Sequence, residues 1–155
     1  LCLTDWEISQ FKTTGVAESN TGAVGYVTVT KLDNGDLQLD TNHIPDHDTG
    51  VFPNPNPGGA NPNPIVEQTQ TYTVPNNPMI AAKTSCLNMG TVGVAVNGVA
   101  LFSPFDLEGD NAVEGPGAET FDSCDGHPTG NGLYHYHQLP DCLSDNTPGQ
   151  LIGVA

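Results

Sequence analysis

The sequence predicts an all-β protein, a disulfide-stabilised β-sandwich or irregular barrel with long Pro/Gly-rich loops. Three observations lead to this prediction: short runs alternate polar with apolar residues, Asn-Gly turns stand between them, and helical periodicity is hard to find. A chain of 155 residues is long enough for one domain with a sizeable core. We therefore expect a single domain over residues 1–155.

The alternating runs predict six short strands. They cover Tyr26–Lys31, Leu37–Asp40, Gln70–Val74, Thr91–Val96, Val99–Phe102 and Leu133–His137. Asp33-Asn34-Gly35 joins the first two runs, and Asn97-Gly98 joins the fourth and fifth, so we expect each of these pairs to form a hairpin. The only helical signal is a turn or two around Asp5–Phe11.

Two loops stand out by composition. Between Pro53 and Pro64 the prolines fix φ and remove backbone donors, so we expect an ordered surface loop there. The acidic segment Asp106–Glu119 resembles a calcium loop in the spacing of its first carboxylates. The comparison fails in detail because Asn111 takes the place of the glycine at the sixth position, so only a looser calcium site is expected as an alternative.

The charge balance excludes several classes of partner. Three lysines and no arginine stand against eighteen carboxylates, which gives a formal net charge of -15. The positive charge that drives nucleic-acid binding is missing, and anionic membranes are equally poor partners. No apolar run approaches the roughly 20 residues needed to span a bilayer, so membrane insertion is not expected. Metal cations, basic proteins or a mineral surface suit the negative field better.

An even number of cysteines in an acidic, Gly/Pro-rich chain indicates two disulfides and an oxidising compartment. Three pairings are open. We favour Cys124 with Cys142, which brackets a histidine cluster, and Cys2 with Cys86, which ties the first residues to the middle of the chain. The alternative is a zinc site that uses Cys124 and His127, although the other cysteines are far from ligand spacing. We expect an extracellular, secreted protein.

The histidines predict a metal site. His135 and His137 are two apart on a predicted strand and therefore project to one face, with Cβ atoms roughly 6 to 7 Å apart. His127 lies upstream, before the Gly-rich run Thr129–Gly132, which can fold this residue back onto the strand. Three imidazoles with one open position are typical of a binding or catalytic site for zinc or copper, so we expect a divalent transition metal at His127, His135 and His137.

A second histidine group surrounds a proline. His43 and His47 bracket Pro45, so the two need not share the metal of the first group, and we interpret them as a second metal site or as support for the first. The acidic residues near the two groups are candidate acceptors for imidazole N–H groups, or additional ligands. These residues are Asp46, Asp48, Asp122 and Asp125.

The last four residues repeat an earlier motif. Ile152–Ala155 echoes Val92–Ala95 and then stops without a turn, a cap or a polar tail. We expect the natural chain to continue past Ala155, with the final strand completed by a further segment or by a neighbouring copy in a homo-oligomer. Coincidence among Gly, Val and Ala residues is the alternative.

An ordered series of motifs resembles a known family. The motifs are Asn42-His43-Ile44-Pro45-Asp46-His47, Gly50-Val51-Phe52-Pro53, Asn61-Pro62-Asn63-Pro64-Ile65, Tyr72-Thr73-Val74-Pro75, Val94-Ala95-Val96-Asn97-Gly98-Val99, Gly126-His127 and Tyr134-His135-Tyr136-His137. In this order they resemble the YHYH-domain proteins, secreted or surface proteins of unknown function. The resemblance covers roughly Asn42–Ala155 and implies a location and a domain type rather than an activity. Family members continue into an Asp-Gly-Phe-Pro-Ile-Tyr-Gly stretch, which this chain lacks.

Three functional hypotheses follow. The first is an extracellular metal-binding β-domain in which zinc or copper has a structural, sequestering or adhesive role. The second is a metal-dependent enzyme with an open water position, in which Asp122 or Asp125 is the general base and Tyr134 or Tyr136 stabilises an oxyanion. The third is an acidic, calcium-associated matrix protein. We prefer the first because no cationic residue stands near the histidines to orient an acidic substrate, and the sequence leaves catalysis open.

Overall fold

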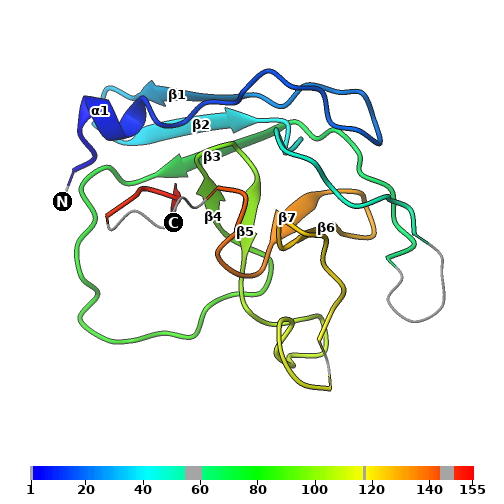
Figure 1. Cartoon of the computed structure of the whole chain (residues 1–155). Helices are drawn as coiled ribbons and strands as arrows, with labels where there is room; N and C mark the ends of the chain where they lie inside the picture. Colours follow the sequence, from blue (N-terminus) through cyan, green and yellow to red (C-terminus); the bar gives the residue numbers. More distant parts are fainter. Residues whose placement is uncertain (1, 55–60, 117, 144–148) are drawn as a thin grey trace.

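Two β-sheets packed in layers form the protein (Figure 1). The computed structural model describes residues 2–54, 61–116, 118–143 and 149–155. Within these ranges the sheets have three and five strands and neither closes into a barrel. The predicted all-β, sandwich-like fold is confirmed.

The three-stranded sheet is an antiparallel meander in the order β1-β2-β3. Its strands are β1 (Val27–Lys31), β2 (Leu37–Thr41) and β3 (Gln70–Val74). The predicted turn closes β1 onto β2, with Gly35 at a φ of 90° and a hydrogen bond of 2.8 Å from Leu32 N to Asp36 O. Glycine adopts this left-handed backbone without a steric cost, which is why the turn forms at Gly35.

The five-stranded sheet has the order β6-β7-β5-β4-β8. Its strands are β4 (Thr91–Ala95), β5 (Ala100–Phe102), β6 (Gly126–Pro128), β7 (Tyr134–Tyr136) and β8 (Gly153–Val154). The predicted Asn97-Gly98 hairpin joins β4 to β5, and β7 then lies parallel to β5 and antiparallel to β6. Strand β6 was not predicted, because three residues that include a proline carry no alternation.

One short helix precedes the sheets. Helix α1 (Asp5–Ile8) begins at Thr4, whose side chain accepts from the Glu7 N–H while the Glu7 carboxylate accepts from the Thr4 N–H. This reciprocal capping box satisfies two backbone donors that a helix start otherwise leaves free. The helical turn expected around Asp5–Phe11 is confirmed.

Two apolar clusters form the core. The first lies between the sheets and contains Phe11, Val27, Leu37, Leu39 and Val94. The second places the rings of Tyr134 and Tyr136 against residues of the long connection between β2 and β3 and of the β4–β5 hairpin: Ile44, Phe52, Ile65, Ala95 and Val99. Both tyrosines are fully buried. Because side chains alternate along a strand, the tyrosines fix one face of β7 in the core and turn His135 to the other face.

The two segments with the repeated motif are neighbours in the sheet. β8 pairs antiparallel with β4, with Val94 opposite Val154 and Ala95 opposite Gly153. A Cβ atom at Gly93 or Gly153 would collide with the backbone of the other segment, so the close pairing requires small residues on both sides. The expected further segment or copy beside β8 remains a prediction.

One of the two predicted disulfides forms. Cys124 and Cys142 are bonded, with their Cα atoms 5.1 Å apart. The predicted Cys2–Cys86 bond is wrong, because both cysteines are free and exposed. Cys86 is exposed in the irregular connection between β3 and β4.

The Pro/Gly-rich segment is closed at its base by a hydrogen bond of 2.7 Å from Asn54 N to Asn61 O. Its central residues, 55–60, lie outside the described residues. Within the described ranges, no helix has both the length and the apolar character needed to cross a membrane.

Gly126 is a test of how β6 is held against the core. We expect Gly126→Ala to lower the free energy of unfolding by about 1 to 3 kcal/mol, because the added methyl group would overlap the phenol ring of Tyr134. Gly130→Ala is the matched control, since a Cβ atom there meets no neighbour. Urea unfolding of both variants measures the difference, and equal midpoints would contradict this packing.

Candidate metal centre

The antiparallel pair β6 and β7 brings two of the predicted ligands together. His127 on β6 lies directly opposite His135 on β7. Residues in such cross-strand pairs have Cβ atoms about 4.5 to 5.5 Å apart on one face of the sheet. His137 follows β7 two residues after His135, so it extends the same face. The Gly-rich turn Thr129–Gly132 folds β6 back onto β7 as the sequence predicted, with a hydrogen bond of 3.0 Å from Thr129 N to Leu133 O.

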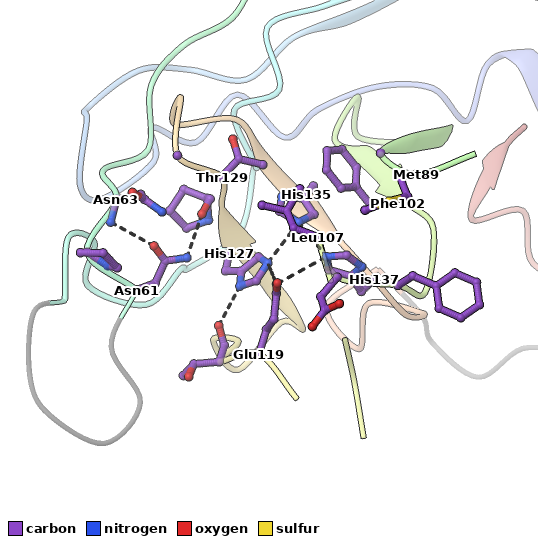
Figure 2. Close-up of a pocket in the computed structure, with 17 residues that line it drawn as sticks. Asn61, Asn63, Met89, Phe102, Leu107, Glu119, His127, Thr129, His135 and His137 are labelled. Atoms are coloured by element: carbon purple, nitrogen blue, oxygen red, sulfur yellow. Dashed lines mark hydrogen bonds and ion pairs between the residues drawn. The ribbon is translucent and has the colours of Figure 1, made fainter. Parts of the chain in front are cut away.

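The three imidazole rings point their Nε2 atoms at one another (Figure 2). The Nε2 atom of His135 lies 3.1 Å from that of His127 and 3.0 Å from that of His137. All three side chains are buried, with exposed fractions of 5%, 2% and 9% for His127, His135 and His137. The structure therefore brings together the three histidines that the sequence selected.

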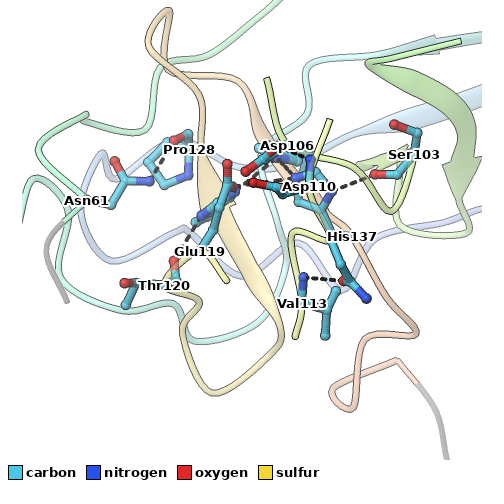
Figure 3. Close-up of polar contacts among 12 residues, drawn as sticks. Asn61, Ser103, Asp106, Asp110, Val113, Glu119, Thr120, Pro128 and His137 are labelled. Carbon is cyan, nitrogen blue, oxygen red and sulfur yellow. Dashed lines mark hydrogen bonds and ion pairs between the residues drawn. The ribbon is translucent and has the colours of Figure 1, made fainter. Parts of the chain in front are cut away.

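The other nitrogen of each ring, Nδ1, donates a hydrogen bond to a backbone carbonyl. His127 Nδ1 donates to Thr120 O at 2.9 Å, His135 Nδ1 to Leu133 O at 3.2 Å, and His137 Nδ1 to Ser103 O at 2.6 Å; Figure 3 includes the contact of His137 with Ser103. A carbonyl oxygen only accepts, so the Nδ1 atoms carry the protons. In the neutral rings, all three Nε2 atoms are then left with unshared electron pairs.

The Nε2 lone pair of His135 lies 3.0 to 3.1 Å from the Nε2 atoms of the other two rings, and lone pairs this close repel one another unless a positive charge lies between them. A proton on one Nε2 atom is the simplest such charge, but burial opposes it. Burial lowers the pKa of His127 to about 4. Burial lowers the pKa of His135 well below its ordinary value, and the neighbouring His127 and His137 lower it further. The arrangement therefore suits a bound cation better than a proton.

A fourth group, Glu119, completes the cluster. Its Oε2 atom lies 2.9 Å from His127 Nε2 and 3.6 Å from His137 Nε2, and its side chain is 33% exposed. Burial raises the pKa of Glu119, the neighbouring His137 lowers it, and the nearby carboxylates Asp106 and Glu108 raise it, with burial the largest effect. The sequence analysis named Glu119 only as the last residue of the acidic segment Asp106–Glu119 and did not predict it as a ligand. The one sequence signal for such a role is that Glu119 lies eight residues before His127.

The four ligand atoms fit a transition metal. They all lie within 4.8 Å of one another, and the four measured separations run from 2.9 to 3.6 Å. Ligands about 2.0 to 2.1 Å from a tetrahedral zinc ion are about 3.3 Å apart, which falls inside this range. Imidazole nitrogen and carboxylate oxygen are ligands of both zinc and copper.

Aromatic rings hold two of the imidazoles in place. Phe102, at the end of β5, stacks on His135 with ring centroids 3.9 Å apart, and Phe121 lies against His127 at 4.6 Å. Stacking on one side and a carbonyl hydrogen bond on the other restrict rotation of each ring. The cluster is thus organised before any ion arrives, which lowers the cost of binding.

Comparison with known proteins places the chain in a family. The sequence model described as YHYH protein matches residues 71–155. The chain belongs to the YHYH protein family. The resemblance inferred from the motifs is confirmed, and all four residues of the candidate cluster, Glu119, His127, His135 and His137, lie within the matched range. No curated protein and no solved structure matches the chain.

The tyrosines of the YHYH motif connect to the second histidine group. His47 Nε2 accepts from the Tyr136 hydroxyl at 2.6 Å, and its Nδ1 donates to Asp48 O at 3.0 Å. The Asn97 amide donates to the Tyr136 hydroxyl at 3.1 Å and to Asp46 at 3.2 Å. His47 and Asp46 therefore hold the tyrosine face of β7, away from the cluster of His127, His135 and His137.

His43 has a different structural role. It is buried, its φ is 56°, and its Nε2 lies 3.0 Å from the Tyr72 hydroxyl, while its Nδ1 has no partner among the described residues. Among the described residues, no group of three or more ligand atoms within 4.8 Å of one another contains both His43 and His47. The cluster of His47 with Cys124 and Cys142 is excluded as a site because both sulfurs are in the disulfide.

The two predicted carboxylate helpers organise the loop before β6. Asp122 accepts from the Tyr134 hydroxyl at 2.7 Å and from the backbone N–H groups of Cys124 and Gly126. Asp125 accepts from the Gln138 amide and from a backbone N–H. Backbone carbonyls, rather than these carboxylates, receive the imidazole protons. The hydroxyls of Tyr134 and Tyr136 are also committed on the far face of β7, which weakens their assignment as oxyanion donors.

The buried His43 is expected to lower the free energy of unfolding as the pH becomes acidic. Burial lowers its pKa in the folded state to about 4, from 6.5, so the unfolded chain binds a proton first as the pH falls. Its contribution to folding is therefore unchanged above pH 6.5 and becomes unfavourable between pH 6.5 and 4. We expect wild type to lose roughly 2 kcal/mol more than His43→Asn between pH 7 and 4.5, since asparagine tolerates the left-handed backbone but does not titrate. Chemical unfolding with a chelator present measures this, and parallel pH profiles would contradict it.

Proposed function

We propose that this YHYH-family chain is a transition-metal-binding domain, in which His127, His135 and His137 hold Zn²⁺ or Cu²⁺ through Nε2 and Glu119 supplies a fourth ligand. The observation that carries the proposal is that the Nε2 atom of His135 lies 3.1 Å from that of His127 and 3.0 Å from that of His137, while each Nδ1 donates to a carbonyl. One cation satisfies all three facing lone pairs at once.

The bound metal has a structural or sequestering role in this proposal. His127 and His135 come from neighbouring strands, and Glu119 comes from the irregular connection between β5 and β6. One ion thus ties this connection to the sheet edge. A domain that folds around its metal gains stability in proportion to the logarithm of metal concentration over the dissociation constant.

An extracellular location is part of the proposal. The disulfide between Cys124 and Cys142 supports it, because such bonds persist in oxidising compartments. The formal charge of -15 suits a role that gathers cations at the surface, of which an adhesive contact with a mineral or a basic partner is one form. The calcium alternative has less support at Asp106, whose Oδ1 atom already accepts from the N–H groups of Glu108 and Asp110.

Removal of two ligands tests the proposal. We expect the protein purified in the presence of zinc or copper to retain one tightly bound ion, and the double variant His135→Ala, His137→Ala to retain none, because one imidazole and one carboxylate are too few. Elemental analysis measures the content. His47→Gln is the matched control, since it changes a histidine outside the cluster. Equal metal content in the double variant and wild type would refute this site.

A second candidate function is metal-dependent hydrolysis. Glu119 favours it, because this residue comes from an irregular segment and is one-third exposed, whereas the histidines are buried. In this second candidate only the three histidines would hold the metal, and the Glu119 carboxylate would be free to take a proton from a water in the open position. Glu119 therefore replaces Asp122 and Asp125 as the candidate general base.

Glu119→Gln separates this function from passive binding. If Glu119 is the base, we expect turnover of simple esters or peptides by the zinc-loaded protein to fall by about 100-fold or more in the variant while the histidines retain the metal. Glu114→Gln, an exposed change in the same connection, is the control and is expected to keep full turnover. Absence of turnover in metal-loaded wild type across the panel would reject hydrolysis and leave the binding role.

A further inference from the structure

A cavity of about 470 Å³ opens directly onto the metal cluster. His127, His135, His137 and Glu119 all line it, so the Nε2 atoms that face one another also face this space (Figure 2). Pockets that hold small organic ligands typically measure about 300 to 1,000 Å³. A metal at these four residues would therefore sit at the base of a ligand-sized pocket rather than in a closed structural site.

The remaining wall is largely apolar. It includes Phe102 at the end of β5, Phe105 and Leu107 in the segment that follows β5, and Met89 just before β4. Phe105, Leu107 and Met89 are strongly exposed even though they line a cavity. Apolar side chains around a polar base suit a ligand that has one metal-binding group and an apolar body.

The opposite wall is held by hydrogen bonds of its own. The Asn61 amide donates to Pro128 O at 2.8 Å, and its Oδ1 atom accepts from Asn63 N at 3.0 Å. Figure 3 shows the first of these contacts, which joins the segment after the Pro/Gly-rich loop to β6. This wall is fixed without a ligand, so binding would not have to order it.

The charged groups around the cavity favour a ligand with a single negative charge. None of the chain's three lysines lines it, and the acidic groups that do are Glu119 and Asp106. A divalent ion held by three neutral imidazoles and one carboxylate has one remaining positive charge. One singly charged anionic donor neutralises that charge, whereas a second negative charge on the ligand would face Asp106 without a cationic partner.

We propose that the cavity binds a small organic monoanion that coordinates the metal through its anionic oxygen and lays an apolar, ring-bearing body against Phe102, Phe105 and Leu107. This inference rests on the proposed metal site and adds a ligand class to it.

Hydroxamates of different size test the proposal on the zinc-loaded full chain. Benzohydroxamate and acetohydroxamate present the same metal-binding group, so any difference in affinity reports the contact of the ring with the wall. We expect benzohydroxamate to bind at least tenfold more tightly by calorimetry. Benzoate is expected to bind more tightly than phthalate, which carries a second negative charge.

The variant Leu107→Ala is expected to fold like wild type, because the Leu107 side chain is 87% exposed and not part of the core. We expect it and Phe105→Ala each to weaken benzohydroxamate binding by about threefold or more and to leave acetohydroxamate binding unchanged. Val51→Ala, which removes an apolar side chain 76% exposed outside the cavity, is the control and is expected to change neither.

Metal content measured on the same samples distinguishes the two levels of failure. A chain that takes up no zinc would overturn the metal site itself. A fully zinc-loaded chain that binds neither hydroxamate, or binds both equally, would overturn the ligand proposal and leave the metal site standing. Equal binding of benzohydroxamate to the metal-free and zinc-loaded chains would also overturn it, because the ligand would then not use the metal.

Discussion

Three hydrogen bonds from imidazole Nδ1 atoms to backbone carbonyls determine what the histidine cluster can bind. The acceptors are the carbonyls of Thr120, Leu133 and Ser103, which lie on three separate segments of the chain. A carbonyl has no proton to give, so each bond fixes a tautomer and leaves Nε2 as a pure electron-pair donor. A cation is the partner that three such donors share, and the proposed metal and ligand chemistry both depend on this arrangement.

The alternation of the YHYH motif separates stability from binding. Tyr134 and Tyr136 occupy the core face of β7, where Asp122, His47 and Asn97 engage their hydroxyls. The histidines occupy the other face. Apolar burial and hydrogen bonds of the tyrosines thus hold β7 in place from one side. The histidine side of the strand can therefore present unpaired Nε2 atoms, although these contribute little to the stability of the fold by themselves.

Local sequence patterns predicted most of the strands and three of the four side chains that the structure brings together in the cluster. The hairpins at Asp33–Gly35 and Asn97-Gly98 follow from turn chemistry, and the shared face of His135 and His137 follows from the two-residue period of a strand. These are properties of a few consecutive residues, so the sequence displays them directly.

Features set by distant contacts were not predictable. Glu119 reaches the cluster from an irregular connection, which has no sequence periodicity to predict its position. The carbonyls that fix the imidazole tautomers belong to the backbone, so the sequence does not show which residues supply them. The pairing of Cys2 with Cys86 was wrong because it relied on cysteine count, which does not reveal which segments meet. The carboxylates expected to help the histidines were close in sequence but serve β6 and the tyrosine face instead.

X-ray absorption spectroscopy at the zinc edge of the metal-loaded protein tests the central claim most directly. The account predicts nitrogen and oxygen scatterers about 2.0 to 2.1 Å from zinc, with multiple scattering from three imidazole rings and no sulfur. A spectrum with one imidazole or none, or with sulfur at about 2.3 Å, would show that the ion binds elsewhere and would contradict the convergence of the three Nε2 atoms on one metal.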